Sequence, residues 1–517
     1  MKTHNRSRSL LSLVNILSGF ANRFLTSVLK LAGRIVFFRF LSAELYGVSS
    51  LFSNVLGLLS LTELGIGTAI TFSLYRPLAE KDEEKVRTLM EFFRKAYLAI
   101  AVTVLVLGLG LMPFLPHLIR DYRGIEFFYL IYLLFLANMV IDYLFSYKRT
   151  LAVAMQEGYC LVPFTTVFEA VICIGQIAVI LLFSSSRYCY LVYLAVQMLC
   201  LFLQNVVINR YLDRRYPLLT RRGPTLPLPD EEKKGILKNV KALMFHKIGG
   251  VVVTSTDSLL ISKLVDLVTV GVYSNYSSII ATVSGLVYLF VGNTTASFGN
   301  LVAKESPEKR RAVFEELQFF YFALYGVCTA LFVTLFQPFI SLSYGKDFTL
   351  PLPVVILVVC ANFYYLGLSY VLDVVKSAAG IYVQDRFVPL WQAGINLAVS
   401  LILGIRIGLA GIFVGTLVST LFILILRPLY VYRNVLESSP LPYYISLVYQ
   451  SLVVAATCGI SLWACRLVPA FSLWVQLVCH FLITLSISVL LFLLFNFRSP
   501  YFAGLLARFR NLFRRAR

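Results

Sequence analysis

The run of residues 96–115, AYLAIAVTVLVLGLGLMPFL, contains no charged side chain over twenty consecutive positions. A helix of that length spans the roughly 30 Å hydrocarbon core of a bilayer. Similar runs recur along the whole 517-residue chain, in which 59% of residues are hydrophobic and 14% are charged, with a mean hydropathy of +0.80. Soluble domains carry about a quarter charged residues. The sequence therefore predicts a polytopic integral membrane protein with almost no soluble domain.

Fourteen apolar runs predict an all-α membrane protein with about fourteen transmembrane helices. The first run follows Lys2, Arg6 and Arg8, as the apolar core of a signal peptide does. It is too long for a signal peptide and no small-residue cleavage site follows it, so we expect it to be retained as a span. The predicted spans are 10–40, 45–75, 89–115, 125–147, 160–184, 188–209, 236–263, 268–300, 314–342, 351–377, 386–406, 409–432, 442–465 and 470–497.

Basic residues are concentrated in alternate loops and at the two ends of the chain. With the N-terminus inside, the cytoplasmic segments hold 32 Lys and Arg residues and the outside segments about 8. Because cytoplasmic loops carry an excess of Lys and Arg, this split predicts that both termini are cytoplasmic. The count places the basic residues of 376–386 and 427–433 in cytoplasmic loops. The net charge of +20 then reflects orientation and anionic membrane lipid, and we expect no nucleic-acid partner.

Residues typical of metal sites and enzymes do not form recognisable motifs. The nine cysteines lie mostly inside apolar runs, and none forms a C-x-x-C pair or a cluster with the four scattered histidines. The chain contains no Gly-rich phosphate loop, no H-E-x-x-H and no G-x-S-x-G. The sequence therefore predicts no metal site, no cofactor, no catalytic residue and no enzymatic activity.

An internal repeat divides the chain. Sliding the sequence by 224 residues pairs 47–87 with 271–311, and 11 of these 41 positions are identical. Among them, Gly47 matches Gly271, and both begin spans of the same orientation. The repeat predicts two six-helix lobes related by an axis along the membrane normal, as in transporters built from parallel repeats. The predicted organisation is an N-terminal lobe, a Pro-rich cytoplasmic linker, a C-terminal lobe, and two additional helices with a basic tail: 1–212, 213–234, 235–434 and 435–517.

Basic side chains inside the membrane are costly, and they therefore mark functional positions. Arg23, Lys30 and Arg34 share one face of the first span, because their spacings of seven and eleven residues are close to whole helical turns. Arg23 also matches Lys247 in the repeat. A cationic cavity implies an anionic substrate, and phosphate is an anion that arginine binds well. We therefore expect Arg23, Lys30, Arg34 and Lys247 to line a cavity for an anionic, phosphate-bearing substrate.

Acidic residues also occur within the spans. They are Glu63, Asp142, Glu169, Asp257 and Asp373. Each is able to neutralise a nearby cation or to bind a coupling proton or Na⁺, and the sequence leaves both roles open.

A short motif at the end of the second span carries a resemblance. Thr62-Glu63-Leu64-Gly65-Ile66-Gly67-Thr68-Ala69 is similar to the acidic-x-Gly-x-Gly pattern of the polysaccharide transporter family, the Wzx-type flippases of the multidrug/oligosaccharidyl-lipid/polysaccharide (MOP) superfamily. Tyr46-Gly47 and Arg76-Pro77-Leu78-Ala79 resemble the family as well. The duplicated fourteen-span layout extends this likeness over nearly the whole chain.

The resemblance implies a flippase that moves an undecaprenyl-diphosphate-linked oligosaccharide unit from the cytoplasmic to the outer leaflet by alternating access. It places the protein in the bacterial cytoplasmic membrane, with the polyprenyl-diphosphate-linked glycan, membrane lipids, a polysaccharide polymerase and glycosyltransferases as expected partners. The cavity cations of the family correspond to Arg23 and Lys247, and the resemblance implies that Arg23, Lys30, Arg34 and Lys247 bind the diphosphate. Lys30 and Arg34 match Thr254 and Ser258 in the second lobe, so the cavity is expected to be asymmetric.

Three other functions compete with this interpretation. A lipid II flippase of the same superfamily fits the same charge pattern. A drug/cation antiporter should have an acidic cavity, which Arg23 and Lys247 oppose. A polysaccharide polymerase or ligase should have a long outside loop with catalytic Arg or His, whereas the predicted outside loops have about ten residues or fewer.

Overall fold

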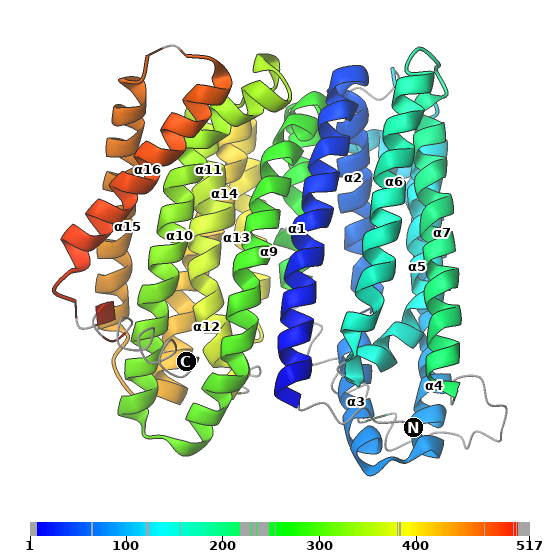
Figure 1. Cartoon of the computed structure of the whole chain (residues 1–517), viewed down its shortest axis with the longest axis horizontal. Helices are drawn as coiled ribbons and strands as arrows, with labels where there is room; N and C mark the ends of the chain where they lie inside the picture. Colours follow the sequence, from blue (N-terminus) through cyan, green and yellow to red (C-terminus); the bar gives the residue numbers. More distant parts are fainter. Residues whose placement is uncertain are drawn as a thin grey trace. The chain divides into compact units, whose positions relative to one another are not determined.

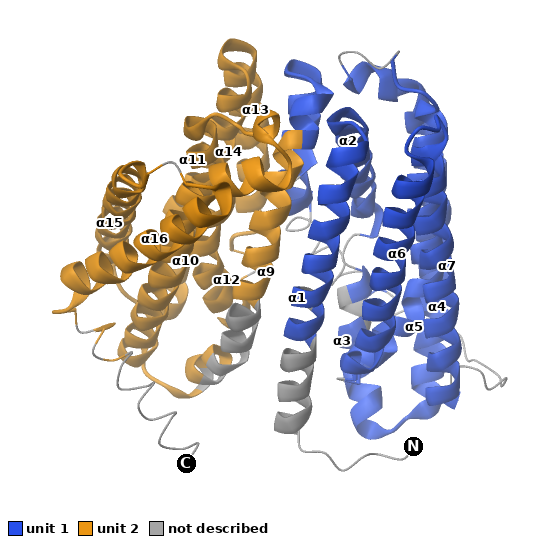
Figure 2. Cartoon of the chain, turned by 45° about the horizontal axis from the view of Figure 1, so that its top comes forward, with its two compact units in different colours: residues 1–271 blue, residues 272–517 orange. Residues whose placement is uncertain are grey.

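The computed structural model describes residues 8–63, 66–119, 124–155, 157–217, 229, 234, 248–253, 255–379, 381, 384–469, 471–499, 501–502 and 504. The chain divides into two compact units, Met1–Gly271 and Val272–Arg517, coloured blue and orange in Figure 2. The boundary lies within one long helix, close to the middle of the chain. The four predicted domain ranges are finer than this division and stay a prediction.

In the described residues of unit 1, all regular secondary structure is helical (Figure 1). Its helix α1 packs against α6, which packs against α7, and α4 packs against α5. Helical segments 248–253 and 255–264 follow in the same unit, and α9 begins there. The elements are α1 (Arg8–Phe40), α2 (Ala43–Leu59), η1 (Ser60–Glu63), α3 (Ile66–Glu80), α4 (Glu83–Leu111), η2 (Met112–Leu118), α5 (Phe128–Ala154), η3 (Gly158–Leu161), α6 (Val162–Phe183) and α7 (Cys189–Arg215).

Unit 2 holds the rest of α9 (Leu267–Lys304) and the remaining helices. The last two helices, α15 and α16, pack against each other and against α10. Two π-helical turns, η6 and η7, interrupt the helical path. The elements are α10 (Pro307–Ser343), η5 (Lys346–Phe348), α11 (Leu352–Val359), η6 (Cys360–Tyr365), α12 (Leu366–Ala379), α13 (Val388–Ile407), α14 (Leu409–Val431), η7 (Tyr432–Leu436), α15 (Leu441–Arg466) and α16 (Leu473–Asn496).

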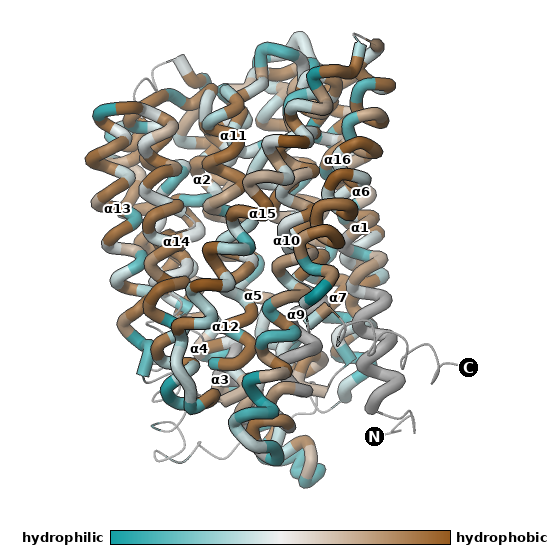
Figure 3. Tube along the Cα trace, turned by 90° about the vertical axis from the view of Figure 1, so that its left-hand side faces the viewer, coloured by the Kyte–Doolittle hydropathy of each residue, from teal (hydrophilic) through white to brown (hydrophobic). Residues whose placement is uncertain are grey.

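The observed helices confirm the all-α membrane fold. Among the described residues, 11 helical stretches are long and apolar enough to cross a bilayer, and they coincide with predicted spans two to six and nine to fourteen. The other three predicted spans correspond to α1, to the segments 248–253 and 255–264, and to α9. Hydrophobic residues run along α16 in Figure 3, and many of its large apolar side chains are exposed at the protein surface. Such a surface is stable against lipid tails, so the chain is a multi-pass membrane protein.

Two predicted spans are less regular than continuous helices. The predicted span 45–75 is divided into α2, the short 3₁₀ turn η1 and α3, and Glu63 is the last residue of η1. The predicted span 351–377 contains the π-helical turn η6 between α11 and α12. Hydropathy does not predict either feature, because apolar residues continue on both sides of each interruption.

Local sequence explains several helix starts. Ser42 and Asp82 accept hydrogen bonds from the backbone N–H groups of Leu45 and Lys85, which caps α2 and α4. Proline occupies the first turn of α6, α10, α13 and α15, where its missing N–H is not needed. Gly411 and Gly415 of α14 form a G-x-x-x-G pair whose backbone lies directly against α13, so that a Cβ at Gly411 would come 2.2 Å from the Leu403 oxygen.

The repeat-related glycines Gly47 and Gly271 lie against each other within unit 1. A Cβ atom on Gly47 would come within 2.1 Å of the Leu267 oxygen, and one on Gly271 within 2.2 Å of the Ala43 oxygen. Residues 43 and 267 are themselves 224 positions apart, so the two contacts are equivalent under the sequence repeat. The two backbones approach so closely here that neither position has room for a side chain.

Candidate functional site

A pocket in unit 1 contains two of the predicted diphosphate-binding residues. Its volume is about 310 Å³, and it lies among α1, α6, α7 and the start of α2. The lining combines charged, amide and phenol groups with a few apolar side chains. The residues are Lys30, Gly33, Arg34, Tyr46, Glu169, Ile172, Cys173, Gln176, Tyr193, Gln197 and Leu201.

Helix geometry brings the two cations together. Lys30 and Arg34 are four residues apart on α1, so their side chains occupy the same helix face. Between them, Gly33 lets α6 approach closely, because a Cβ there would be 3.3 Å from the Cys173 sulfur. The Cys173 thiol lies 3.0 Å from the Leu29 carbonyl oxygen, to which it donates a hydrogen bond, fixing α6 against α1. Lys30 and Arg34 therefore line the same pocket.

A carboxylate on α6 balances part of the positive charge. The Lys30 ammonium lies 2.8 Å from Glu169, with 63% of the lysine side chain and 30% of the glutamate side chain exposed. The Arg34 guanidinium lies 4.8 Å from the centre of the Tyr46 ring, which is cation–π geometry. One carboxylate therefore faces two cations in this pocket, and the described lining keeps an excess of positive charge. The amide of Gln176 donates to Gln197 at 3.0 Å on the opposite wall.

The other two predicted ligands are not placed by the structure. The side chain of Arg23 and the whole of Lys247 lie outside the described residues. The four-residue diphosphate site therefore stays a prediction, of which Lys30 and Arg34 form the described part.

The acidic residues within spans have different environments. Asp142 of α5 lies 3.3 Å from Arg149, and Asp373 of α12 lies 2.8 Å from Arg427 and 3.7 Å from Lys376. These two carboxylates are therefore paired. Asp257 is buried in the helical segment 255–264, with 4% of its surface exposed. Whether any of them couples an ion stays a prediction.

Glu63, the acidic residue of the sequence motif, lines a second pocket of unit 1. This pocket of about 510 Å³ also contains Tyr97 and Arg149. A Cβ atom on Gly67 would come 2.8 Å from a Glu63 carboxylate oxygen and 2.9 Å from the Tyr97 hydroxyl oxygen. The last glycine of the motif therefore leaves room for this carboxylate beside the phenol, a physical reason for glycine at this position.

Sequence reasoning missed a buried ion network in unit 2. The charge count treated Lys376 and Arg427 as cytoplasmic loop residues, although the predicted spans 351–377 and 409–432 contain them. In the structure they are residues of α12 and α14 whose side chains are only 7% and 6% exposed. Both approach Asp385, at 3.1 and 3.3 Å, and Asp385 is 1% exposed. A count of charges near the ends of spans does not show which of them are buried between helices. The sequence feature that could have indicated this network is the pair of acidic residues, Asp373 and Asp385, on either side of Lys376.

Polar residues of the first pocket were also missed. Gln176, Tyr193 and Gln197 are uncharged, so a search for intramembrane charges passes over them. Gln176 follows Glu169 by seven residues on α6, a spacing that indicates a shared helix face. Within the part of the chain that the structure describes, no group of three or more His, Cys, Asp or Glu side chains is arranged to hold a metal ion.

Solved structures show which fold these elements form. The structure described as lipid II flippase MurJ in an inward closed conformation matches with a TM-score of 0.67 and 14% identity, over 93% of this chain and 99% of that one. An inward-facing multidrug resistance MATE family transporter of the MOP superfamily gives 0.59 and 13%, over 79% and 95%. A MOP superfamily transporter from Pyrococcus furiosus, described as having a binding pocket of reversed polarity, gives 0.53 and 12%, over 83% and 96%. The fold is that of MOP-superfamily transporters.

Comparison by sequence gives the family. No curated protein matches the chain at a significant level. The model of the polysaccharide biosynthesis protein family matches residues 12–298, which is more than half of the chain and includes both pockets of unit 1 described above. The chain therefore belongs to the polysaccharide biosynthesis protein family.

Proposed function

We propose that the protein is a flippase that moves an undecaprenyl-diphosphate-linked oligosaccharide unit from the inner to the outer leaflet of the bacterial cytoplasmic membrane. The product serves the biosynthesis of a surface polysaccharide: capsule, exopolysaccharide or O-antigen. Family membership and the transporter fold support transport in polysaccharide biosynthesis. The observation that carries the proposal is the pocket in which Lys30 and Arg34 lie together within membrane-spanning helices.

The charges of the pocket suit a diphosphate. Two cations four residues apart are able to contact both phosphates of one diphosphate, and an arginine binds two phosphate oxygens at once. In the empty pocket, the pair between Lys30 and Glu169 lowers the cost of holding an ammonium inside the membrane. An arriving diphosphate displaces Glu169 from Lys30, and Glu169 restores the pair when the substrate leaves.

The direction of transport agrees with the membrane potential. Moving one negative charge out of a cell whose inside is negative is favoured by about 2.3 kcal/mol per 100 mV. We propose alternating access as the transport cycle, with both chain termini in the cytoplasm. A polysaccharide polymerase and glycosyltransferases act on the product and the precursor, and they are the proposed protein partners.

Two transport alternatives differ in substrate. Lipid II also carries a diphosphate on a polyprenyl chain, and the likeness to MurJ favours it as the second candidate. A cationic drug is opposed by the excess of positive charge in the described pocket. We do not propose an enzyme, because the family and the fold neighbours point to transport.

The experiment measures flipping of fluorescent undecaprenyl-diphosphate-linked oligosaccharide in vesicles that contain the purified full-length protein. Lys30→Ala and Arg34→Ala should each slow flipping by about tenfold to a hundredfold, the effect of losing one charge-assisted hydrogen bond. Arg39→Ala is the matched control, because Arg39 is an exposed residue of the same helix that does not line the pocket. Equal rates in all three variants contradict the assignment.

Glu169→Gln separates this mechanism from simple charge attraction. Removing the carboxylate leaves Lys30 unopposed, so the diphosphate should bind more tightly while release becomes slower. We expect a lower half-saturating substrate concentration together with a lower maximal rate. Lipid II in parallel vesicles distinguishes the second candidate, since a protein for oligosaccharide units should transport lipid II much more slowly.

Arg23→Ala and Lys247→Ala test the rest of the predicted site in cells. Each should abolish surface polysaccharide without lowering the amount of protein in the membrane. A normal amount of surface polysaccharide in both variants would show that Arg23 and Lys247 do not belong to the site. The vesicle assay then tests Lys30 and Arg34 separately.

A further inference from the structure

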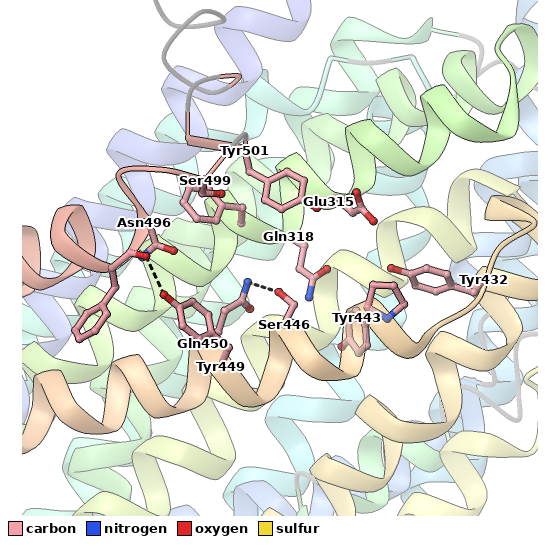
Figure 4. Close-up of a pocket in the computed structure, with 13 residues that line it drawn as sticks. Glu315, Gln318, Tyr432, Tyr443, Ser446, Tyr449, Gln450, Asn496, Ser499 and Tyr501 are labelled. Carbon is pink, nitrogen blue, oxygen red and sulfur yellow. Dashed lines mark hydrogen bonds between the residues drawn. The ribbon is translucent and has the colours of Figure 1, made fainter.

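A separate polar pocket lies in unit 2, where α10 and α15 begin and α14 and α16 end (Figure 4). Its volume is about 240 Å³. The lining combines amide, hydroxyl and carboxylate groups with six aromatic rings. The residues are Glu315, Gln318, Phe319, Tyr432, Pro442, Tyr443, Ser446, Tyr449, Gln450, Phe495, Asn496, Ser499 and Tyr501.

Part of the polar lining is already hydrogen-bonded. The Gln450 amide nitrogen donates to the Ser446 hydroxyl at 2.9 Å, and the Tyr449 hydroxyl donates to the Phe495 carbonyl at 2.8 Å (Figure 4). Glu315 accepts from the Tyr501 hydroxyl at 3.1 Å. The bond of Tyr449 joins α15 to α16, and that of Tyr501 joins the segment after α16 to α10, so helices far apart in the sequence are held together around the pocket.

Two buried polar groups of the lining have no hydrogen-bond partner among the described residues. They are the Gln450 side-chain oxygen and the Tyr432 hydroxyl, and Gln450 is 4% and Tyr432 0% exposed. Leaving a buried polar group unsatisfied costs about 1–3 kcal/mol. A ligand with hydroxyl groups of its own would donate a hydrogen bond to the amide oxygen and form another with the tyrosine hydroxyl.

The charges of the pocket exclude an anionic ligand. Among its described lining residues there is no lysine, arginine or histidine. The carboxylate that is present, Glu315, lies 2.8 Å from Arg311, which is outside the lining. Within this described lining, a phosphate would thus meet a carboxylate and no cation. An uncharged ligand with several hydroxyl groups meets acceptors and donors, and the flat faces of the aromatic rings suit its C–H bonds.

Size and position narrow the ligand further. A water molecule takes about 30 Å³ of liquid volume, so a pocket of about 240 Å³ holds the equivalent of roughly eight water molecules. That is room for one small ring and not for a chain of sugars. Tyrosines gather at the membrane–water interface, where their rings are apolar and their hydroxyls are hydrated. Four of the lining residues are tyrosines near helix ends, which places the pocket at the level of lipid headgroups. We propose that this pocket binds a single uncharged pyranose ring carried by a membrane lipid.

The test is photolabelling of the full-length protein in phosphatidylcholine vesicles with a photoactivatable monoglucosyl diacylglycerol. Tyr432→Phe removes only the unpartnered hydroxyl, and it should lower labelling at limiting probe by about threefold to tenfold, the effect of one hydrogen bond. Gln450→Leu removes the unpartnered oxygen and should lower labelling at least as much. Labelled peptides should come from α15 and from the end of α16.

Matched controls come from the same unit. Tyr325 and Gln392 are also buried and line no part of this pocket, and the Tyr325 hydroxyl is also unpartnered. The extent of photolabelling of Tyr325→Phe and of Gln392→Leu should equal that of the unchanged protein. Tyr432→Phe keeps the proposal testable if Gln450→Leu does not fold, since it removes a single atom.

Competition identifies the source of the sugar. Unlabelled diacylglycerol without sugar should not compete, and monoglucosyl diacylglycerol should. If undecaprenyl-diphosphate-glucose also competes, the pocket accepts the sugar of a diphosphate-linked lipid. If this lipid does not compete, the pocket accepts only sugars linked to a diglyceride. Equal competition by sugar-free diacylglycerol, or equal labelling of Tyr432→Phe and Tyr325→Phe, overturns the proposal. The result does not depend on flipping, so it is independent of the proposed function.

Discussion

The buried ion network of unit 2 leads to a quantitative prediction for Asp385→Asn. Asparagine has nearly the same shape as aspartate, so the substitution removes charge and leaves packing almost unchanged. Asp385 lies 3.1 Å from Lys376 and 3.3 Å from Arg427. After the substitution, both buried cations still contact Asp373, which is 37% exposed and therefore compensates their charge less well than the buried Asp385 does.

The expected loss follows from the burial of the three residues. Removing one partner of a buried ion pair costs about 3–5 kcal/mol, because an uncompensated charge remains in a region of low polarity. For a unit of about this size, one kcal/mol corresponds to a change of roughly 2–4 °C in the unfolding temperature. We therefore expect Asp385→Asn to lower the Tm by roughly 6–20 °C.

Native cysteines provide the assay. All nine are free, and Cys465 of α15 is buried in unit 2, so a thiol-reactive dye reports unfolding when it gains access. Asp347→Asn is the control, since Asp347 is an exposed acid of the same unit. The double variant Asp385→Asn/Lys376→Met leaves Arg427 paired with Asp373, and it should be more stable than Asp385→Asn alone.

Two results would refute this reasoning. One is a Tm for Asp385→Asn that equals that of Asp347→Asn, which would show that the network contributes nothing. The other is additive losses from Asp385→Asn and Lys376→Met, which would show that the two charges do not interact.

Three further predictions concern unit 1. Gly67→Ala should reduce flipping in the vesicle assay while leaving the amount of membrane protein unchanged, because the added methyl would lie 2.8 Å from a Glu63 carboxylate oxygen and displaces it. Gly47→Val should lower the Tm by several degrees in the dye assay, since the side chain collides with the backbone oxygen of Leu267. Lys148→Met should lower the free energy of unfolding by about 1–3 kcal/mol in the same assay. The Lys148 ammonium lies 2.6 Å from the part-buried Asp213, which loses this charge partner in the variant. An unchanged Tm would contradict this prediction.

The fold was largely predictable because membrane burial imposes a length on each apolar run. The regular helices α4 to α7 and α13 to α16 fall close to their predicted ranges. The 3₁₀ turn before Glu63 and the π-helical turn η6 were not predictable, because they depend on packing against other helices and leave the hydropathy unchanged.

The candidate site was predictable in part. Intramembrane charges stand out in a sequence, so Lys30 and Arg34 were identified, and their spacing gave the shared face. The sequence could not predict that Glu169 pairs with Lys30, because five acidic residues within the spans were candidates. The packing of α6 against α1 selects Glu169. The pocket at the ends of α10, α15 and α16 gave no sequence signal, because its amides and phenols are common in such segments.

The contact between Gly47 and Gly271 has a genetic consequence. Each glycine faces the backbone turn that leads to the other, the Leu267 carbonyl for Gly47 and the Ala43 carbonyl for Gly271, so the first large residue at either position separates the two backbones by itself. A second large residue then enters space that has already been opened and should cost far less than it would alone. The two positions should therefore show strong epistasis and change together or not at all, although they lie 224 codons apart.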